Sequence, residues 1–304
     1  MKINNTLLRK EAKAFDKLVK KRIKDGFIPD INLKQNFLFF KNNPWKFVET
    51  QKISITSKIN FVIKNTKKNM KCLDIGSGLG TLAFQLARKK RYVHGIDISQ
   101  NSVTFSKKYI NNKNNLKKFC KFSNISFQNL KLDEKYDRVI FFKTLHHLPD
   151  ISAVLNKCHS LLKKNGKILI VEPLRNNFNL YNAIICYLIR ILFKKQKIKL
   201  KVNNITKDVE KILFENLYVD KNNKKQQSPM DNVSSSEYEI KKKLEKKFII
   251  QNISYTDAIK DKLIGQLNKK QLDKELKFLI NFEKYLINKS LLKGVTVQIV
   301  AKKK

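Results

Sequence analysis

A short segment of the chain combines an acidic residue, a turn rich in glycine and the start of a helix. It reads Cys72-Leu73-Asp74-Ile75-Gly76-Ser77-Gly78-Leu79-Gly80-Thr81. The apolar run is typical of a buried strand, and Thr81 opens a stretch with helical periodicity. Glycines let the backbone approach a ligand closely because no Cβ is in the way, and the free N–H groups of a helix N-terminus follow them. This pattern predicts a loop that binds a small molecule.

A second acidic residue ends the next expected strand. Asp97 lies 17 residues after Gly80, in the segment HGIDIS, and an acid at this place can accept both hydroxyls of a ribose. The glycine spacing is G-x-G-x-G, whereas dinucleotide-binding loops have G-x-G-x-x-G. Asp74 would repel a pyrophosphate but would suit an ammonium group. The two acids therefore predict a nucleoside-containing cofactor with an amino-acid moiety.

Alternating strands and helices would position these residues. Short apolar runs predict strands over 71–75, 92–97, 125–128, 136–142, 167–172, 248–255 and 294–301. Helical periodicity predicts helices over 6–24, 48–63, 81–89, 102–110, 151–162, 180–193, 207–217 and 270–286. Strands that alternate with helices indicate an α/β protein with a mostly parallel sheet.

Three further motifs follow the glycine loop in order: YDRVI at 136–140, TLHHLPD at 144–150 and LLKKNGK at 161–167. Together with the loop and Asp97 they resemble the class I S-adenosylmethionine (SAM)-dependent methyltransferases of the type 11/12-like kind. The stretches DGFIPD and NNPWKF are similar to leader regions of methyltransferases from bacterial surface-sugar and lipid-linked gene clusters. The resemblance implies a Rossmann-like, seven-stranded, mostly parallel sheet with an antiparallel last strand and helices on both faces.

The resemblance also implies a division of the chain. Residues 1–69 would form a helical leader that covers the cofactor, and residues 70–173 the SAM-binding core. Residues 174–247 would be a helical insertion after the fifth strand, and residues 248–304 would complete the sheet.

Carried over residue by residue, the resemblance implies a set of cofactor contacts. Asp74 would lie near the amino group of SAM, and Asp97 would hold the ribose hydroxyls. Asn129 stands about where related enzymes place an acid that bonds the adenine amine. The complete implied set is Asp74, Gly76, Ser77, Gly78, Gly80, Asp97, Ile98, Asn129, Phe142 and Lys143.

Methyl transfer to a hydroxyl needs positioning, desolvation and help with the hydroxyl proton. His146 and His147 follow the fourth strand, and Glu172 ends the fifth. The resemblance implies that this tandem of histidines and the glutamate form the catalytic group. In the alternative interpretation one histidine, His147, merely caps and packs the start of a helix.

The chain has 304 residues and a formal net charge of +40, mostly from lysines spread along its length. This excess fits a solvated surface encoded by an AT-rich genome, and an anionic partner is the alternative. No Asn/Asp-Pro-Pro-aromatic motif follows the fourth strand, so RNA or tRNA methylation is the less favoured function. A non-catalytic binding protein of the same fold is a further alternative. Methyl transfer to a hydroxyl or an amine of a small-molecule, sugar or lipid-linked acceptor is favoured.

The four cysteines are scattered, no histidine lies at metal-ligand spacing from them, and the N-terminal segment lacks an apolar signal-peptide region. These features predict a cytoplasmic protein without a metal site. The longest apolar stretch, 180–193, is too short to span a bilayer and runs into the basic stretch 194–201. Such a segment suits an amphiphilic acceptor or peripheral contact with the anionic inner membrane face, or else a lid. In each case we expect the insertion to set acceptor specificity.

Overall fold

The computed structural model describes residues 5–35, 47–111, 113–131, 133–174, 177–194, 202–216, 228–231, 236–264 and 269–304. These residues build one seven-stranded sheet in the order β3-β2-β1-β4-β5-β7-β6. The strands are β1 (Lys71–Ile75), β2 (Tyr92–Asp97), β3 (Cys120–Asn124), β4 (Tyr136–Phe142), β5 (Leu162–Pro173), β6 (Phe248–Thr256) and β7 (Thr296–Lys303).

Only β7 runs against its neighbours. It pairs antiparallel with β5 on one side and with β6 on the other, whereas β1, β2, β3, β4 and β5 pair in parallel. The predicted Rossmann-like α/β fold with an antiparallel last strand is therefore confirmed.

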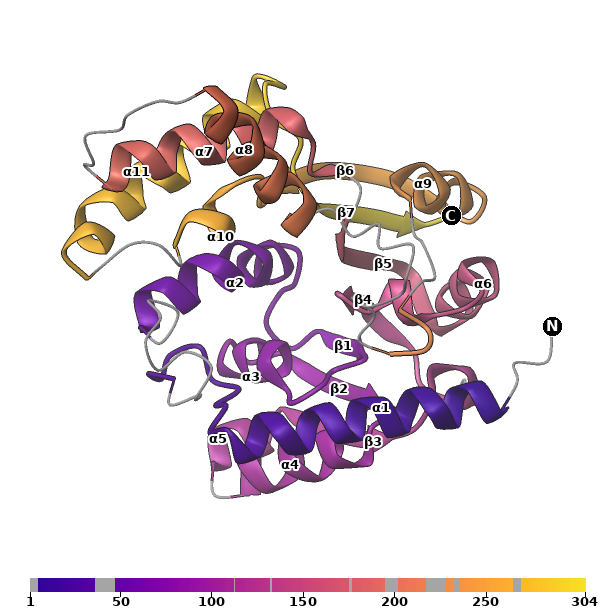
Figure 1. Cartoon of the computed structure of the whole chain (residues 1–304). Helices are drawn as coiled ribbons and strands as arrows, with labels where there is room; N and C mark the ends of the chain where they lie inside the picture. Colours follow the sequence, from indigo (N-terminus) through magenta and orange to yellow (C-terminus); the bar gives the residue numbers. More distant parts are fainter. Residues whose placement is uncertain are drawn as a thin grey trace.

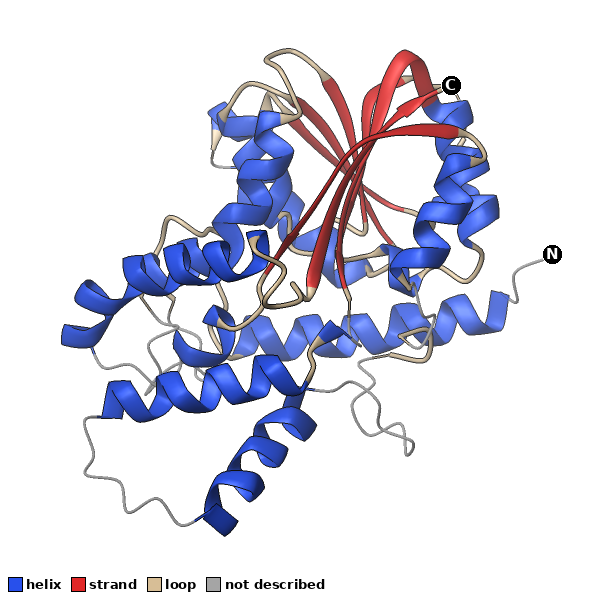
Figure 2. Ribbon diagram, turned by 90° about the horizontal axis from the view of Figure 1, so that it is seen from above, coloured by secondary structure: helices blue, strands red, loops and turns tan. Residues whose placement is uncertain are grey.

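Helices cover both faces of the sheet, as Figure 2 shows edge-on. Side chains alternate between the faces along each strand, so Val139 and Phe141 of β4 join one apolar cluster while Ile140 joins the other. The first cluster includes α6 and α9, and the second includes α2, α3, α4 and α5. These helices are α2 (Val48–Lys64), α3 (Thr81–Arg88), α4 (Gln100–Asn111), α5 (Asn114–Lys117), α6 (Ile151–Leu161) and α9 (Glu237–Glu245).

A third apolar cluster belongs to the remaining C-terminal helices. These helices lie near the end of β6 and the start of β7 (Figure 1). The helices of this cluster are α7 (Leu180–Lys194), α8 (Val202–Asn216), α10 (Lys260–Leu263) and α11 (Lys269–Asn288). The N-terminal helix α1 (Asn5–Lys24) runs across the ends of the strands instead of along a face (Figure 2). The C-terminal helices thus have an apolar cluster of their own, separate from the two clusters on the faces of the sheet.

Buried charges tie the leader to the C-terminal helices. Lys58 of α2 is 1% exposed and lies 2.5 Å from Asp257 at the end of β6. Lys260 also pairs with Asp257, and it lies 2.8 Å from Glu283 of α11. Removing one member would leave an uncompensated buried charge, which costs about 3–5 kcal/mol in proteins.

Two expectations from the sequence are wrong in detail. The third strand is Cys120–Asn124 and not 125–128, where the chain instead forms the short 3₁₀ turn η3 (Phe127–Asn129). β3 is an edge strand in which Lys121 is exposed between buried Cys120 and Phe122. It therefore lacks the continuous apolar run that is typical of a buried strand. The fifth strand begins at Leu162 and not at residue 167.

Candidate active site

A cavity of about 630 Å³ lies at the carboxyl ends of the parallel strands. The glycine loop, the ends of β2 and β4, helix α1 and residues of the C-terminal half all contribute to its wall. Ligands of open α/β sheets bind at this edge, where the strand order reverses. Here the reversal lies between β1 and β4.

Asp97 lines this cavity at the end of β2. Its Oδ2 accepts a hydrogen bond of 2.8 Å from the N–H of Gly78, and its Oδ1 accepts one of 2.8 Å from the N–H of Ser99. Burial raises the pKa of Asp97 to about 6, although these two backbone bonds oppose the shift. The carboxylate is thus held in a fixed orientation, with acceptor capacity left for hydroxyl groups.

Asp74, near the end of β1, is only 1% exposed. Neither of its carboxylate oxygens has a hydrogen-bond partner among the described residues. Burial, followed by the nearby charge of Asp97, raises the pKa of Asp74 to about 7. A buried carboxylate without a partner is costly, and a cation bound beside it would remove that cost.

The loop between the two acids is shaped by left-handed backbone conformations. Gly76, Gly78 and Gly80 have φ values of +69°, +52° and +86°. The N–H groups of Gly76 and Ser77 donate to the carbonyl of Ile96, which fastens the loop to β2. Gly80 is the N-cap of α3, so the loop leads directly into a helix N-terminus.

Gly76 and Gly78 provide a matched pair for a stability test. A Cβ at Gly76 would overlap the Thr144 side chain, whereas a Cβ at Gly78 would meet nothing within 4 Å. Both substitutions by Ala carry the left-handed penalty of about 1–2 kcal/mol, but only Gly76→Ala adds a clash. We expect denaturant unfolding to show a clearly larger loss for Gly76→Ala. Equal losses would mean that Thr144 does not limit the approach of the loop.

Five of the ten predicted cofactor residues line the cavity, and five do not. Gly76, Gly78, Asp97, Ile98 and Lys143 line it. Asp74, Ser77, Gly80, Asn129 and Phe142 are not part of the lining.

Asn129, which was expected to lie near the adenine amine, does not line the main cavity. It lines a separate surface hollow beside α1, and its neighbour Gln128 lines the main cavity together with Phe127. The turn η3 rotates Asn129 outward, because its N–H bonds back to the side chain of Ser126. The error in the position of the third strand explains why the sequence pointed to Asn129, whereas Gln128 is the amide that lines the cavity.

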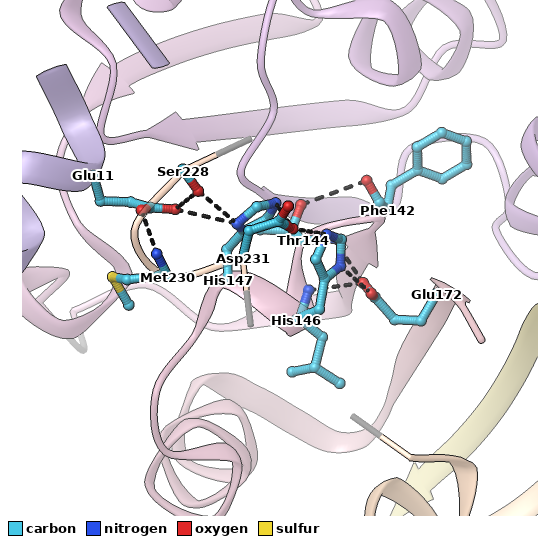
Figure 3. Close-up of polar contacts among 10 residues, drawn as sticks. Glu11, Phe142, Thr144, His146, His147, Glu172, Ser228, Met230 and Asp231 are labelled. Atoms are coloured by element: carbon cyan, nitrogen blue, oxygen red, sulfur yellow. Dashed lines mark hydrogen bonds and ion pairs between the residues drawn. The ribbon is translucent and has the colours of Figure 1, made fainter. Parts of the chain in front are cut away.

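The tandem histidines lie in the 3₁₀ turn η4 (Leu145–His147) directly after β4, and both line the cavity. Glu172 is fully buried behind them. Its Oε1 accepts from the N–H groups of Thr144 and Leu145, at 2.6 and 2.7 Å, and its Oε2 accepts from Nδ1 of His146 at 2.6 Å. Glu172 therefore positions the turn and one imidazole, as Figure 3 shows, and does not itself face the cavity.

The second imidazole is held by a residue from the other end of the chain (Figure 3). Glu11 of α1 lies 3.1 Å from Nδ1 of His147 and also accepts from the hydroxyl of Ser228 and the N–H of Met230. These partners could not be found from the sequence, because Glu11 lies on a mostly basic helix far along the chain from His147. Ser228, Met230 and Asp231 belong to a polar stretch of the insertion 174–247. Met230 was the available signal, because it is an apolar residue within a polar run and is buried.

Asp231 completes the cluster and changes the expectation about metals. Side-chain ligand atoms of His146, His147 and Asp231 all lie within 4.8 Å of one another. Among the residues that the structure describes, this is the one group of three or more His, Cys, Asp or Glu side chains arranged in this way. No metal site was predicted because no histidine lies at metal-ligand spacing from a cysteine along the sequence. The third residue of this cluster, Asp231, lies 84 residues after His147.

Comparisons with known proteins settle the family. A family model described as a methyltransferase domain matches residues 66–279, more than two thirds of the chain. The chain belongs to this methyltransferase family. The match covers the glycine loop, the histidine turn and the insertion, so the predicted family is confirmed.

Curated relatives match part of this methyltransferase. A ubiquinone biosynthesis O-methyltransferase of Pelagibacter ubique is 34% identical over 114 residues, which is 38% of this chain and 46% of that protein. One from Rhodopseudomonas palustris is 29% identical over 111 residues, which is 36% of this chain and 42% of that protein. The aligned part therefore spans less than half the length of these two relatives.

A solved structure shares the fold over nearly the whole length. It is the magnesium protoporphyrin IX methyltransferase from Synechocystis PCC 6803 with bound S-adenosylhomocysteine. The TM-score is 0.52 at 15% sequence identity, and the match covers 96% of this chain and 97% of that chain. At this identity the likeness shows the fold.

In the described part of the chain, none of the helices combines the length and the apolar character that a bilayer span requires.

The raised pKa of Asp74 leads to a prediction about pH. A cationic amino group prefers the carboxylate form, so the affinity for SAM should fall as the pH drops below about 7. Asp74→Asn should bind SAM more weakly at pH 8 and lose most of this dependence between pH 8 and 6. Calorimetric titration at pH 8, 7 and 6 measures both effects. A wild-type affinity that does not change over this range would contradict the prediction.

The ligand-free protein offers a control with the opposite sign. The folded-state pKa of Asp74 lies above its unfolded value of about 3.9, so ionisation of this group opposes folding. Its contribution to the free energy of unfolding is therefore favourable at low pH and is lost as the pH rises through about 7. Asp74→Asn should resist denaturant better than wild type at pH 8, and this advantage should disappear towards pH 4.

Proposed function

We propose that this SAM-dependent methyltransferase transfers a methyl group to a hydroxyl of a small-molecule, sugar or lipid-linked acceptor. One observation carries the proposal: a single cavity connects the glycine loop and Asp97 to the two histidines. One part of its wall thus has the groups that suit a nucleoside cofactor, and another has imidazoles suited to an acceptor hydroxyl.

The residues present fit the cofactor. The buried oxygens of Asp74 lack partners, Asp97 retains acceptor capacity, and Gly78 leaves open space where a side chain would stand. We assign the amino group to the vicinity of Asp74 and the ribose hydroxyls to Asp97. Ile98 and Phe127 provide apolar surface for the base, and Gln128 replaces Asn129 in our proposal as the amide nearest to it. When bound, SAM supplies a methyl group on a sulfonium, which leaves as a neutral thioether.

The histidine pair would act on the acceptor. Glu172 fixes His146 and Glu11 fixes His147, so both rings are oriented before an acceptor arrives. Their unbonded Nε2 atoms can then assist removal of the hydroxyl proton. Phe15 packs edge-on against His147, with the ring centroids 5.1 Å apart, and it lines the cavity beside Leu148. Such apolar walls exclude water from the reacting groups.

Transfer of a methyl label tests this function. Purified enzyme is incubated with SAM labelled in the methyl group and with an extract of the native cells, and the labelled compound is identified. We expect a labelled methyl ether that is absent when Asp97→Ala replaces the wild type. Label on nitrogen, carbon or RNA would refute the hydroxyl assignment. No labelled product, together with normal SAM binding, would favour a non-catalytic binding protein.

A lipid-linked or amphiphilic acceptor is supported by helix α7. Five of its apolar side chains form an exposed row at helical spacing, namely Leu180, Tyr181, Ile184, Leu188 and Leu192. An apolar row on a helix followed by lysines suits the surface of an anionic membrane. The lysines 195–201 of the predicted basic flank lie outside the described residues. We therefore propose that the insertion 174–247 sets acceptor choice and brings the enzyme to the inner membrane face.

Vesicle sedimentation tests the membrane part of this proposal. Leu188→Ser combined with Leu192→Ser should weaken sedimentation with phosphatidylglycerol vesicles, because these side chains are 48% and 73% exposed. The matched control is Ile249→Ser, which removes an apolar side chain of 55% exposure from β6, outside the insertion. If wild-type protein stays in the supernatant at low salt, α7 is a lid and not a membrane contact.

A further inference from the structure

The two imidazoles of the active site share an unusual arrangement. In each ring Nδ1 faces a buried carboxylate, Glu172 for His146 and Glu11 for His147. An ionised carboxylate can only accept a hydrogen bond, so in the neutral ring Nδ1 carries the proton and Nε2 carries the lone pair. Histidines that bind metals have this same outer partner, which fixes the tautomer and raises the basicity of the ligating nitrogen.

Both Nε2 atoms lie near one oxygen. Oδ1 of Asp231 lies 3.7 Å from Nε2 of His146 and 3.8 Å from Nε2 of His147. These separations exceed the 2.7–2.9 Å, roughly, of a charge-assisted hydrogen bond. Two metal–ligand bonds of about 2.1 Å that meet at the tetrahedral angle separate their ligand atoms by about 3.4 Å. The separations between the rings and Asp231 are within a few tenths of an ångström of that spacing.

The charge of the cluster favours a cation as well. Glu11, Glu172 and Asp231 are each no more than 1% exposed, and they surround two rings that are neutral in this tautomer. Burying several carboxylates is costly unless positive charge lies nearby. Thr144 and Leu145 already use Oε1 of Glu172 through backbone N–H groups, which supply hydrogen bonds but no full charge.

We propose that His146, His147 and Asp231 bind a divalent transition-metal cation at the acceptor end of the cavity. Two imidazoles and one carboxylate suit Zn²⁺ or Co²⁺ and disfavour Mg²⁺ and Ca²⁺, which prefer oxygen ligands. Three protein ligands leave a coordination position open toward the cavity, as catalytic sites do. The role of the ion rests on the proposed function: it would bind the acceptor hydroxyl and lower its pKa, so that the proton leaves to solvent before the oxygen takes the methyl group.

Metal titration of the full chain tests the site without any acceptor. Protein treated with a chelator and then dialysed is titrated with Zn²⁺ by calorimetry and with Co²⁺ by visible absorption. We expect one equivalent per chain, unaffected by excess Mg²⁺, and a Co²⁺ spectrum with bands typical of nitrogen and oxygen ligands. Loss of a residue that hydrogen-bonds to a metal ligand weakens metal binding by roughly 10–100-fold. We expect the effect of Glu11→Gln on Zn²⁺ affinity to fall within that range. Asp231→Asn changes a proposed ligand itself and should weaken Zn²⁺ binding by more.

His159→Gln is the matched control, because His159 lies on α6 and does not line the cavity. It should bind Zn²⁺ like the wild type. SAM affinity of Asp231→Asn should also stay at the wild-type value, which shows that the variant folds. Absence of a stoichiometric Zn²⁺ or Co²⁺ site in wild type, or equal binding by wild type and Asp231→Asn, would overturn the proposal. Because neither readout needs methyl transfer, a failure here is distinguishable from a failure of the proposed function.

Discussion

Replacing Asp97 by Ala should weaken SAM binding by about 10²-fold or more. The carboxylate is expected to accept two ribose hydroxyls, and a hydrogen bond to a charged group contributes about 1.5–3 kcal/mol. Titration calorimetry measures the change. Because Asp97 also accepts from Gly78 and Ser99, Asp97→Asn is the second variant: it keeps a side chain of the same size and should still lose most of the affinity.

Asp16→Asn is the matched control for this prediction. Asp16 of α1 accepts from the hydroxyl of Ser99 at 2.7 Å and from the N–H of Asn101 at 3.0 Å, so it supports the same loop. It does not line the cavity. A loss in Asp16→Asn as large as that in Asp97→Ala would mean that the loop conformation matters and that direct contact with the ribose does not.

Replacing His146 by Gln should lower kcat by about 10²–10⁴-fold, the range that a positioned proton acceptor contributes. The expectation holds whether Nε2 takes the proton or holds an ion that would lower the pKa of the acceptor hydroxyl, and the metal titration separates the two. SAM affinity should change little, because His146 lies beside the acceptor and is fixed by Glu172. The assay is methyl transfer to the acceptor identified from the labelled extract.

His159→Gln again provides the control, with turnover expected at the wild-type value. His147→Gln should also reduce kcat, because both rings border the cavity. If both active-site variants turn over near the wild-type rate, the enzyme works by positioning alone. The histidines would then have only the packing role that the sequence left open for His147.

Much of the fold could be predicted because local patterns specify it. β1, β2 and β4 are short apolar runs with clear boundaries, and their residue ranges match the expected ones. β3 could not be found in this way, because an edge strand with exposed Lys121 lacks the apolar signature of its neighbours. Helix α9 lies after a polar run and buries only Ile240 and Leu244 among its nine residues, too weak a periodicity to recognise.

The cofactor loop could be predicted from the sequence, whereas the surroundings of the two histidines could not. Asp74 to Gly80 act through a contiguous stretch whose backbone geometry demands glycine. The surroundings of the histidines come from Glu11, Glu172 and Asp231, which are separated by more than 200 residues in total. No spacing rule connects them, and only the crossing of α1 over the strand ends brings them together.

The place of β7 in the sheet has a consequence for how the chain folds. β7 lies between β5 and β6 but is synthesised after both. Until it inserts, β5 and β6 each present a row of unpaired backbone groups, and exposed strand edges invite association with other chains. Closing this gap joins residues more than 120 positions apart, as in the pairing of Lys167 with Lys302, and such long-range closure slows folding. We expect chaperone dependence and refolding losses to respond most to changes in β7, and far less to changes in the glycine loop.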